Sequence, residues 1–183
     1  YYALLGMLSK VGLTKNDVNI QAAGPAGVWQ QFAAKKAVAM AGVPDWTSSA
    51  MEAGAQVDIL PADVYFKSMA QAILASDETI QKNPQLIQKL VRATLKGMKD
   101  IMANPKEAAV TYVQNVPAHK GKEASIQSVF EMYNKYVYAN QKVPGQMDET
   151  RLGELQKFYV SNGVVPKEAP LKDLYTNQFA SGK

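Results

Sequence analysis

Few residues in this sequence are of the types that enzymes use for catalysis. His119 is the single histidine, and there is no cysteine. Common zinc sites and Cys/His dyads are therefore excluded. Asp45, Glu52, Asp58 and Asp63 lie near predicted strand ends, but nothing in their spacing singles out an acid–base pair. No Gly-x-Ser-x-Gly motif or glycine-rich phosphate loop occurs. We therefore expect a protein that is not an enzyme, with no catalytic residue, no metal and no cofactor.

Two loops have the composition of a ligand-binding edge. Residues 24–27 read Gly-Pro-Ala-Gly and precede a predicted helix, so their backbone N–H groups can face an anion. Residues 43–46 read Val-Pro-Asp-Trp, where Trp46 offers a flat apolar surface and Asp45 a carboxylate. Ligands of open α/β sheets bind beyond the carboxyl ends of the strands. The alternative is two structural turns, with Asp45 as a helix cap and Trp46 in the core, and the residues alone leave both interpretations open.

The two loops lie in a region, residues 1–76, where predicted helices alternate with predicted strands. Helices are predicted over residues 1–10, 28–36 and 47–53. Buried strands are predicted over residues 18–20, 37–41 and 56–60. Thr47 is the expected N-cap of the third helix. Strands that alternate with short helices are typical of βαβ units, so this pattern predicts an α/β fold with a largely parallel sheet.

The remainder of the chain has helical patterning. Asn83-Pro84 and Asn104-Pro105 each place an N-cap residue before a proline at the first helical position. Apolar residues then recur at helical spacing from Ile87 to Met102, and Glu107 is placed to complete a capping box. Two further helices are predicted, one over residues 126–137 and one that begins at Asp148.

Composition and charge narrow the function classes. The 183 residues carry a net charge of +4, but only Arg92 and Arg151 among the 20 basic residues are arginines. Because no basic stripe is present, the sequence does not predict a nucleic-acid partner. No apolar run approaches the ~20 residues of a membrane span. Arg92 lies beside the apolar stripe of a predicted helix, where it contacts either an anion or a surface partner.

Several sequence blocks occur in a recognisable order. They comprise residues 30–40, 53–60, 73–84, 91–97, 104–109 and 152–179. Together they resemble the solute-binding proteins of ABC transporters, in the nitrate/sulfonate/taurine branch that is also called NMT1/THI5-like. The resemblance covers nearly the whole chain, and Pro44 stands where family members commonly end a strand with proline.

The resemblance implies a periplasmic-binding-protein-like (type II) fold with two lobes and a hinge. Family members are typically longer, so we expect an incomplete copy without its N-terminal part: a three-layer αβα lobe plus C-terminal helices. Residues 1–60 would form most of the second lobe. Residues 61–183 would supply the crossover and the helical C-terminal part of the first lobe.

The resemblance also implies a function. The protein would clasp a small organic or anionic solute (sulfonate, nitrate, taurine or pyrimidine-like) between its lobes and deliver it to an ABC permease. Such a protein is periplasmic, with membrane anchoring open through a missing N-terminus, and monomeric at full length. The implied ligand-binding residues are Tyr1, Tyr2, Gly24, Pro25, Pro44, Asp45 and Trp46. The alternatives are an enzyme of the same fold that resembles a pyrimidine-precursor synthase, and the ligand-sensing domain of a regulator.

Overall fold

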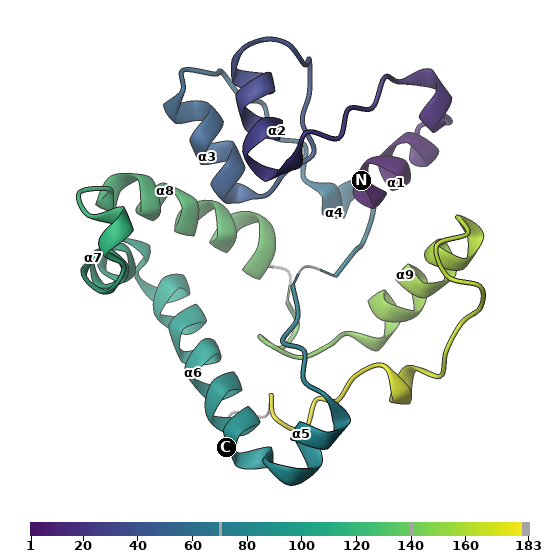
Figure 1. Cartoon of the computed structure of the whole chain (residues 1–183), viewed down its shortest axis with the longest axis vertical. Coiled ribbons are helices and arrows are strands. Elements are labelled where there is room, and N and C mark those ends of the chain that lie inside the picture. The colour runs from purple at the N-terminus through teal and green to yellow at the C-terminus, as the bar shows by residue number, and fades with distance from the viewer. Residues whose placement is uncertain (70, 140, 181–183) are drawn as a thin grey trace. The chain divides into compact units, whose positions relative to one another are not determined.

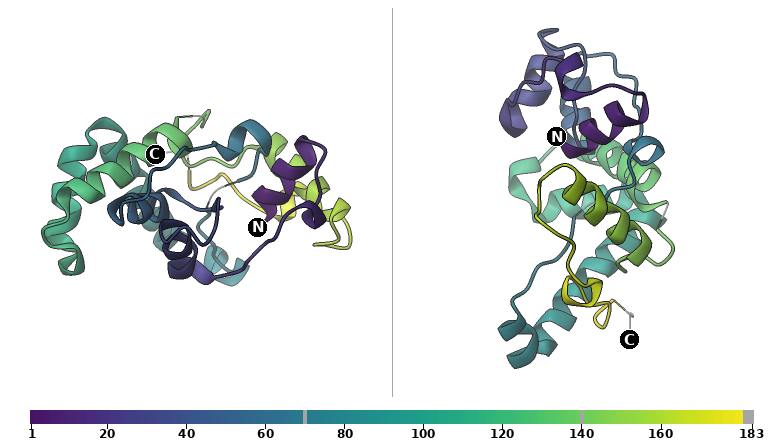
Figure 2. Two further views of the ribbon diagram at one scale, coloured as in Figure 1. Left: turned by 90° about the horizontal axis from the view of Figure 1, so that it is seen from above. Right: turned by 90° about the vertical axis from the view of Figure 1, so that its right-hand side faces the viewer.

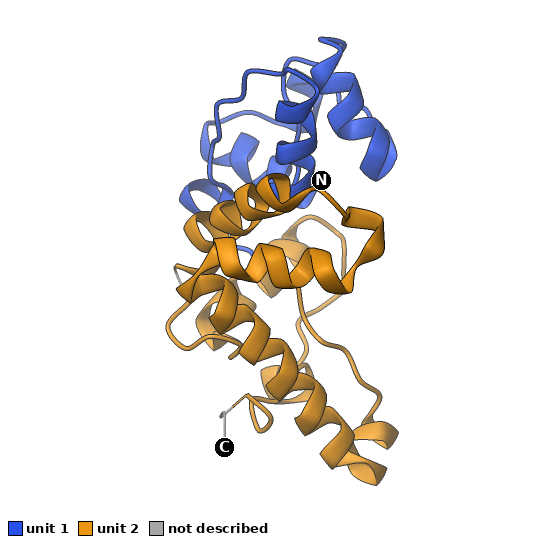
Figure 3. Cartoon of the chain, turned by 90° about the vertical axis from the view of Figure 1, so that its left-hand side faces the viewer, with its two compact units in different colours: residues 1–68 blue, residues 69–183 orange. Residues whose placement is uncertain are grey.

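The computed structural model describes residues 1–69, 71–139 and 141–180 (Figure 1). The described chain is helical and divides into two compact units, unit 1 (Tyr1–Ser68) and unit 2 (Met69–Lys183), coloured separately in Figure 3. The boundary follows Ser68, whereas the predicted lobe boundary follows residue 60. The assignment of residues 1–60 and 61–183 to parts of two lobes stays a prediction.

Unit 1 is built from short helices that pack in pairs. They are α1 (Tyr2–Lys10), the 3₁₀ turn η1 (Lys15–Asp17), α2 (Gly24–Ala33), α3 (Pro44–Glu52) and α4 (Ala62–Tyr65). Helix α2 packs on α3, and α1 packs on α4. The α1–α4 approach depends on Gly6, because a Cβ at this position would come within 2.6 Å of the Phe66 ring. Leu8 and Ala50 are buried in this unit.

The predicted parallel sheet is wrong: no strand occurs in residues 1–69, 71–139 or 141–180. A strand requires a neighbour that exchanges backbone hydrogen bonds with it. Across the described chain, no backbone hydrogen bond joins residues 18–20, 37–41 and 56–60 to one another. None of their apolar side chains is fully buried, and Val38 is fully exposed and Leu60 65% exposed. The α/β fold class, with its periplasmic-binding-protein-like (type II) αβα lobe, is therefore overturned for this chain.

Helices α2 and α3 of unit 1 begin earlier than the sequence pattern predicts. Helix α2 begins at Gly24 instead of residue 28, and α3 begins at Pro44 instead of Thr47. Proline suits the first helical turn because it has no N–H to leave unpaired and its φ is already helical. Thr47 therefore lies inside α3, where its Oγ1 donates a hydrogen bond to the Val43 carbonyl at 3.3 Å. The predicted N-cap role of Thr47 is wrong.

Unit 2 contains the longer helices. They are α5 (Asp77–Lys82), α6 (Pro84–Ala103), α7 (Pro105–Asn115), α8 (Glu123–Tyr133) and α9 (Glu149–Ser161). The π-helix η3 (Asn134–Tyr138) follows α8, and η2 (Pro117–His119) and η4 (Leu171–Asp173) are 3₁₀ turns. Helix α7 packs on both α6 and α8 (Figures 1 and 2). The buried apolar residues of unit 2 in the described chain are Ile87, Ala109, Val113 and Leu155. Within the described ranges, none of the helices is both long and apolar enough to span a membrane.

Side-chain hydrogen bonds confirm two predicted helix starts of unit 2, at Asn104 and Asp148, whereas in the described chain Asn83 precedes α6 without a side-chain cap and α8 begins at Glu123 instead of residue 126. Asn104 Oδ1 accepts the Glu107 N–H at 3.2 Å, and Asn104 Nδ2 donates to the Glu107 carboxylate at 3.1 Å. Asp148 Oδ1 accepts from the N–H groups of Thr150 and Arg151 at 3.0 and 3.1 Å. Both caps satisfy N–H groups that a helix leaves without an internal partner.

Asp148 makes the stability of unit 2 depend on pH. The Arg151 backbone N–H, and then the Lys142 ammonium, hold the pKa of Asp148 below its ordinary value. A lowered folded-state pKa contributes stability above the unfolded-state pKa of about 3.9, and this contribution is lost as pH falls through the folded-state value. Asp148→Asn keeps an acceptor but removes the charge. We therefore expect the thermal midpoint of this variant to fall below wild type near neutral pH.

The gap between the two thermal midpoints should narrow as the pH is lowered from 7 through the depressed folded-state pKa of Asp148, because the native carboxyl then becomes protonated. Circular dichroism melts of both proteins across this pH range measure the gap. An equal gap at both ends of the range would show that the charge of Asp148 does not stabilise α9.

Candidate functional site

The seven residues predicted to bind ligand all lie at helix N-termini of unit 1. Tyr1 and Tyr2 begin α1, Gly24 and Pro25 begin α2, and Pro44, Asp45 and Trp46 form the first turn of α3. The second and third groups belong to one packed pair, because α2 packs on α3. Helix α1 packs on α4 instead. The groups at Gly24 and Trp46 thus lie on two helices that pack on each other, and the two tyrosines lie on the other helix pair of the unit.

Trp46 presents a half-buried ring at the start of α3. The ring lies against the backbone of Gly42, where a Cβ would stand 3.3 Å from Trp46 Cε3. That distance is tighter than ordinary van der Waals contact, so the glycine allows the close approach of the ring. Trp46 is neither enclosed in the core nor fully in solvent. It therefore keeps an accessible part of its surface for an apolar or aromatic partner.

The first turn of α2 offers backbone donors. Gly24 has a φ of +66°, and a Cβ there would meet nothing within 4 Å. In the described chain no side chain caps this helix, and Pro25 occupies its first turn. The residues 24–26 are exposed. Helix N-terminal N–H groups carry partial positive charge, so this turn favours an anion or a carbonyl oxygen.

The first turn of α3 has a different character. Val43 is its N-cap, and the Val43 carbonyl accepts hydrogen bonds from Trp46 N and Thr47 N at 3.0 and 3.1 Å. Asp45 is exposed in this turn, where a carboxylate interacts favourably with the helix dipole. The negative charge beside the Trp46 ring makes this end of α3 unfavourable for an anion. The two loops of the predicted site therefore differ in polarity.

The two tyrosines add aromatic surface to unit 1. Tyr1 is 59% exposed and Tyr2 is 36% exposed. Their ring centroids are 5.3 Å apart in an edge-to-face arrangement. Such pairs are more favourable than a face-to-face sandwich, so the rings support each other's orientation. Each ring combines an apolar face with a hydroxyl that can donate or accept a hydrogen bond.

His119, the single histidine, lies in unit 2 and not in the proposed site. The His119 ring lies 5.4 Å from the Tyr112 ring in unit 2, and its buried Nδ1 has no hydrogen-bond partner among the described residues. In the same described set, no group of three or more His, Cys, Asp or Glu residues is placed to hold a metal ion.

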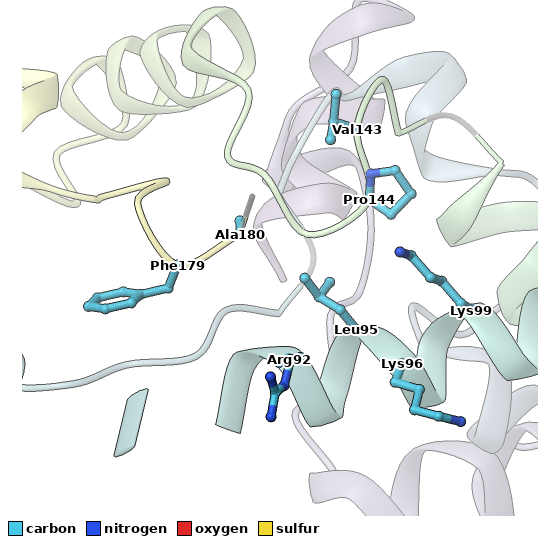
Figure 4. A pocket seen from close by; sticks show the side chains of 8 residues that line it. All are labelled: Arg92, Leu95, Lys96, Lys99, Val143, Pro144, Phe179 and Ala180. Atoms are coloured by element: carbon cyan, nitrogen blue, oxygen red, sulfur yellow. The ribbon is translucent and has the colours of Figure 1, made fainter. Parts of the chain in front are cut away.

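Unit 2 contains a pocket that the sequence did not predict. A pocket of about 360 Å³ lies along α6, and Arg92 lines it (Figure 4). The other walls come from the loop at Val143 and from the chain near Phe179. Arg92, Lys96 and Lys99 follow one another at helical spacing, which is the signal that would have pointed to a cationic face of α6.

Comparisons with known proteins place these observations in context. A family model described as NMT1/THI5 like matches residues 2–108, which is more than half of the chain. The riboflavin-binding protein RibY of Chloroflexus aurantiacus is 27% identical over 186 aligned residues, which cover 100% of this chain and 53% of RibY. The chain thus spans about half the length of this curated relative. No solved structure matches the chain.

Proposed function

Since the chain belongs to the NMT1/THI5-like family, as its motif order indicated, we propose that it binds a small organic solute without changing it chemically. The solute class that we propose is a flat fused-ring compound, with riboflavin as the first candidate. The observation that carries this proposal is the similarity to riboflavin-binding RibY along the whole chain. The proposed site is the set of helix N-termini in unit 1 that carries Trp46, Gly24 and Tyr1.

The residue types of unit 1 suit a ring ligand of this kind. The isoalloxazine ring of riboflavin is flat, apolar on its faces and polar along one edge. Stacking of such a ring on an aromatic side chain contributes about 1–3 kcal/mol. Trp46 supplies a half-buried ring for stacking, and Tyr1 and Tyr2 supply further aromatic surface. The open first turn of α2 supplies N–H groups for the carbonyl oxygens of the ring edge.

The charge of the site favours a neutral solute over a small anion. Riboflavin is uncharged near neutral pH, so its ring can approach the carboxylate of Asp45 without repulsion. Taurine and nitrate lack an aromatic face and would leave the Trp46 ring without a stacking partner. The proposal therefore ranks riboflavin above the sulfonate and nitrate ligands that the family resemblance also allows.

A solute-binding protein of this kind delivers its solute to a membrane protein. We propose that the protein works outside the cytoplasm and delivers its solute to the permease of an ABC importer. This part of the proposal rests on family membership, and it requires a binding protein that releases the solute intact.

A panel of solutes distinguishes the ligand classes. A ligand at about 100 times its dissociation constant adds about 2.7 kcal/mol of stability, which raises the thermal midpoint of a domain of this size by about 5–10 °C. We expect a rise of this order with riboflavin and none with taurine or nitrate. Differential scanning calorimetry measures all three. A rise with taurine or nitrate alone would reject the fused-ring class, and no rise with any of the three would reject riboflavin as the solute of this chain.

A further inference from the structure

The pocket along α6, called here the α6 pocket, is independent of the proposed site because all of its walls belong to unit 2. Its volume of about 360 Å³ lies in the range of sites for small organic molecules. Leu95 forms one wall, Val143 and Pro144 a second, and Phe179 and Ala180 a third. Figure 4 shows Leu95 and Lys99 extending from α6 toward the loop of Val143 and Pro144.

Hydrogen bonds hold the three walls together. The Asn177 side chain accepts from Met147 N at 2.8 Å and donates to the Met147 carbonyl at 3.1 Å, which joins the C-terminal segment to the loop. Gln88 Nε2 donates to the Phe179 carbonyl at 3.4 Å, which joins the same segment to α6. The loop rests on α6 at Gly145, where a Cβ would collide with the Leu95 side chain. The pocket is therefore formed by the packed chain before any ligand arrives.

One edge of the α6 pocket is cationic. Arg92, Lys96 and Lys99 lie on it, and no acidic residue is among the described residues that line the pocket. Lys96 is held by Asp100 at 2.9 Å. Over residues 1–69, 71–139 and 141–180, neither Arg92 nor Lys99 forms an ion pair. Two cations therefore line an apolar hollow without a compensating carboxylate from the described chain.

We propose that the α6 pocket binds a small aromatic carboxylate. The aromatic body would lie among Leu95, Pro144 and Phe179, where burial of apolar surface is favourable. The carboxylate would face Arg92 and Lys99. A guanidinium binds a carboxylate through two parallel hydrogen bonds, and charge-assisted bonds of this kind are stronger than neutral ones. The apolar walls favour an aromatic ring, and the cationic edge favours a carboxylate. Together they favour a ligand that carries both groups.

Calorimetric titration with 2-naphthoate tests the proposal. We expect saturable binding of one 2-naphthoate per chain, and at least about tenfold weaker binding of the neutral analogue 2-naphthalenemethanol, since it lacks the charge that faces the cationic edge. The double variant Arg92→Gln/Lys99→Gln should lose about tenfold in affinity for 2-naphthoate. The matched control is Lys106→Gln/Lys157→Gln, which removes two exposed positive charges outside the pocket. This control should keep the wild-type affinity.

Two further variants locate the bound 2-naphthoate. Ala180→Phe should fill the pocket and weaken binding although the cationic edge is intact. Trp46→Ala, in unit 1, should leave 2-naphthoate binding unchanged, which separates this proposal from the riboflavin site. Equal losses in the pocket and control double variants would overturn the proposal. It would also be overturned by wild-type affinity in Ala180→Phe, or by loss of 2-naphthoate binding in Trp46→Ala.

Discussion

Replacement of Trp46 by alanine is expected to weaken riboflavin binding about 10- to 100-fold. Loss of an aromatic stacking partner removes about 1–3 kcal/mol of binding free energy, and each 1.4 kcal/mol is a factor of ten in affinity. Trp46 lies in the first turn of α3, which packs on α2, and its ring is half-buried. Quenching of riboflavin fluorescence during titration with the protein measures the affinity.

The control for this experiment lies on the same helix. Met51 is also a large apolar side chain of α3 and is 48% exposed. Met51→Ala should therefore alter the apolar surface of α3 to a similar degree without changing riboflavin affinity. Trp46→Phe should recover part of the loss, since phenylalanine keeps an aromatic face. Wild-type affinity in Trp46→Ala, with a folded protein by circular dichroism, would remove Trp46 from the site.

The second large effect is expected at Gly145. Its φ is +83°, and a Cβ would collide with Leu95 of α6. Gly145→Ala combines backbone strain with overpacking, each of about 1–3 kcal/mol. We therefore expect the free energy of unfolding of unit 2 to fall by at least about 2 kcal/mol. Urea denaturation followed by circular dichroism measures this change.

Alanine substitutions at two other glycines distinguish backbone strain from overpacking at Gly145. Gly163 has a φ of +67°, but a Cβ there would meet nothing within 4 Å, so Gly163→Ala carries backbone strain alone. Gly97 lies inside α6 with open space around it, and Gly97→Ala should stabilise the protein by about 0.5–1 kcal/mol. If Gly145→Ala is no more destabilising than Gly163→Ala, the contact of the loop with Leu95 is not tight.

The sequence predicts helices in this protein better than it predicts strands because helix signals are local. The caps at Asn104 and Asp148 act on N–H groups within three residues, so they can be recognised without knowledge of the fold. A strand depends on a partner that is distant in sequence, and a run such as residues 37–41 does not identify that partner. In the structure that run is left as an exposed connection around Val38.

The same distinction applies to the two candidate sites. The sequence placed Gly24, Pro25 and Pro44 in loops beyond strand ends, whereas the structure places them in the first turns of α2 and α3. The sequence did not reveal that α2 and α3 pack together. The α6 pocket is formed by side chains as far apart in sequence as Leu95 and Phe179, so only the packed chain shows it. Family membership was recognisable because it rests on the order of many weak motifs.

Native mass spectrometry of the protein mixed with riboflavin tests the central claim most directly. We expect a complex of one chain with one riboflavin in wild type, and loss of that complex in Trp46→Ala. A spectrum that contains only the bare chain, or an equally abundant complex in the variant, would contradict a riboflavin site built around Trp46.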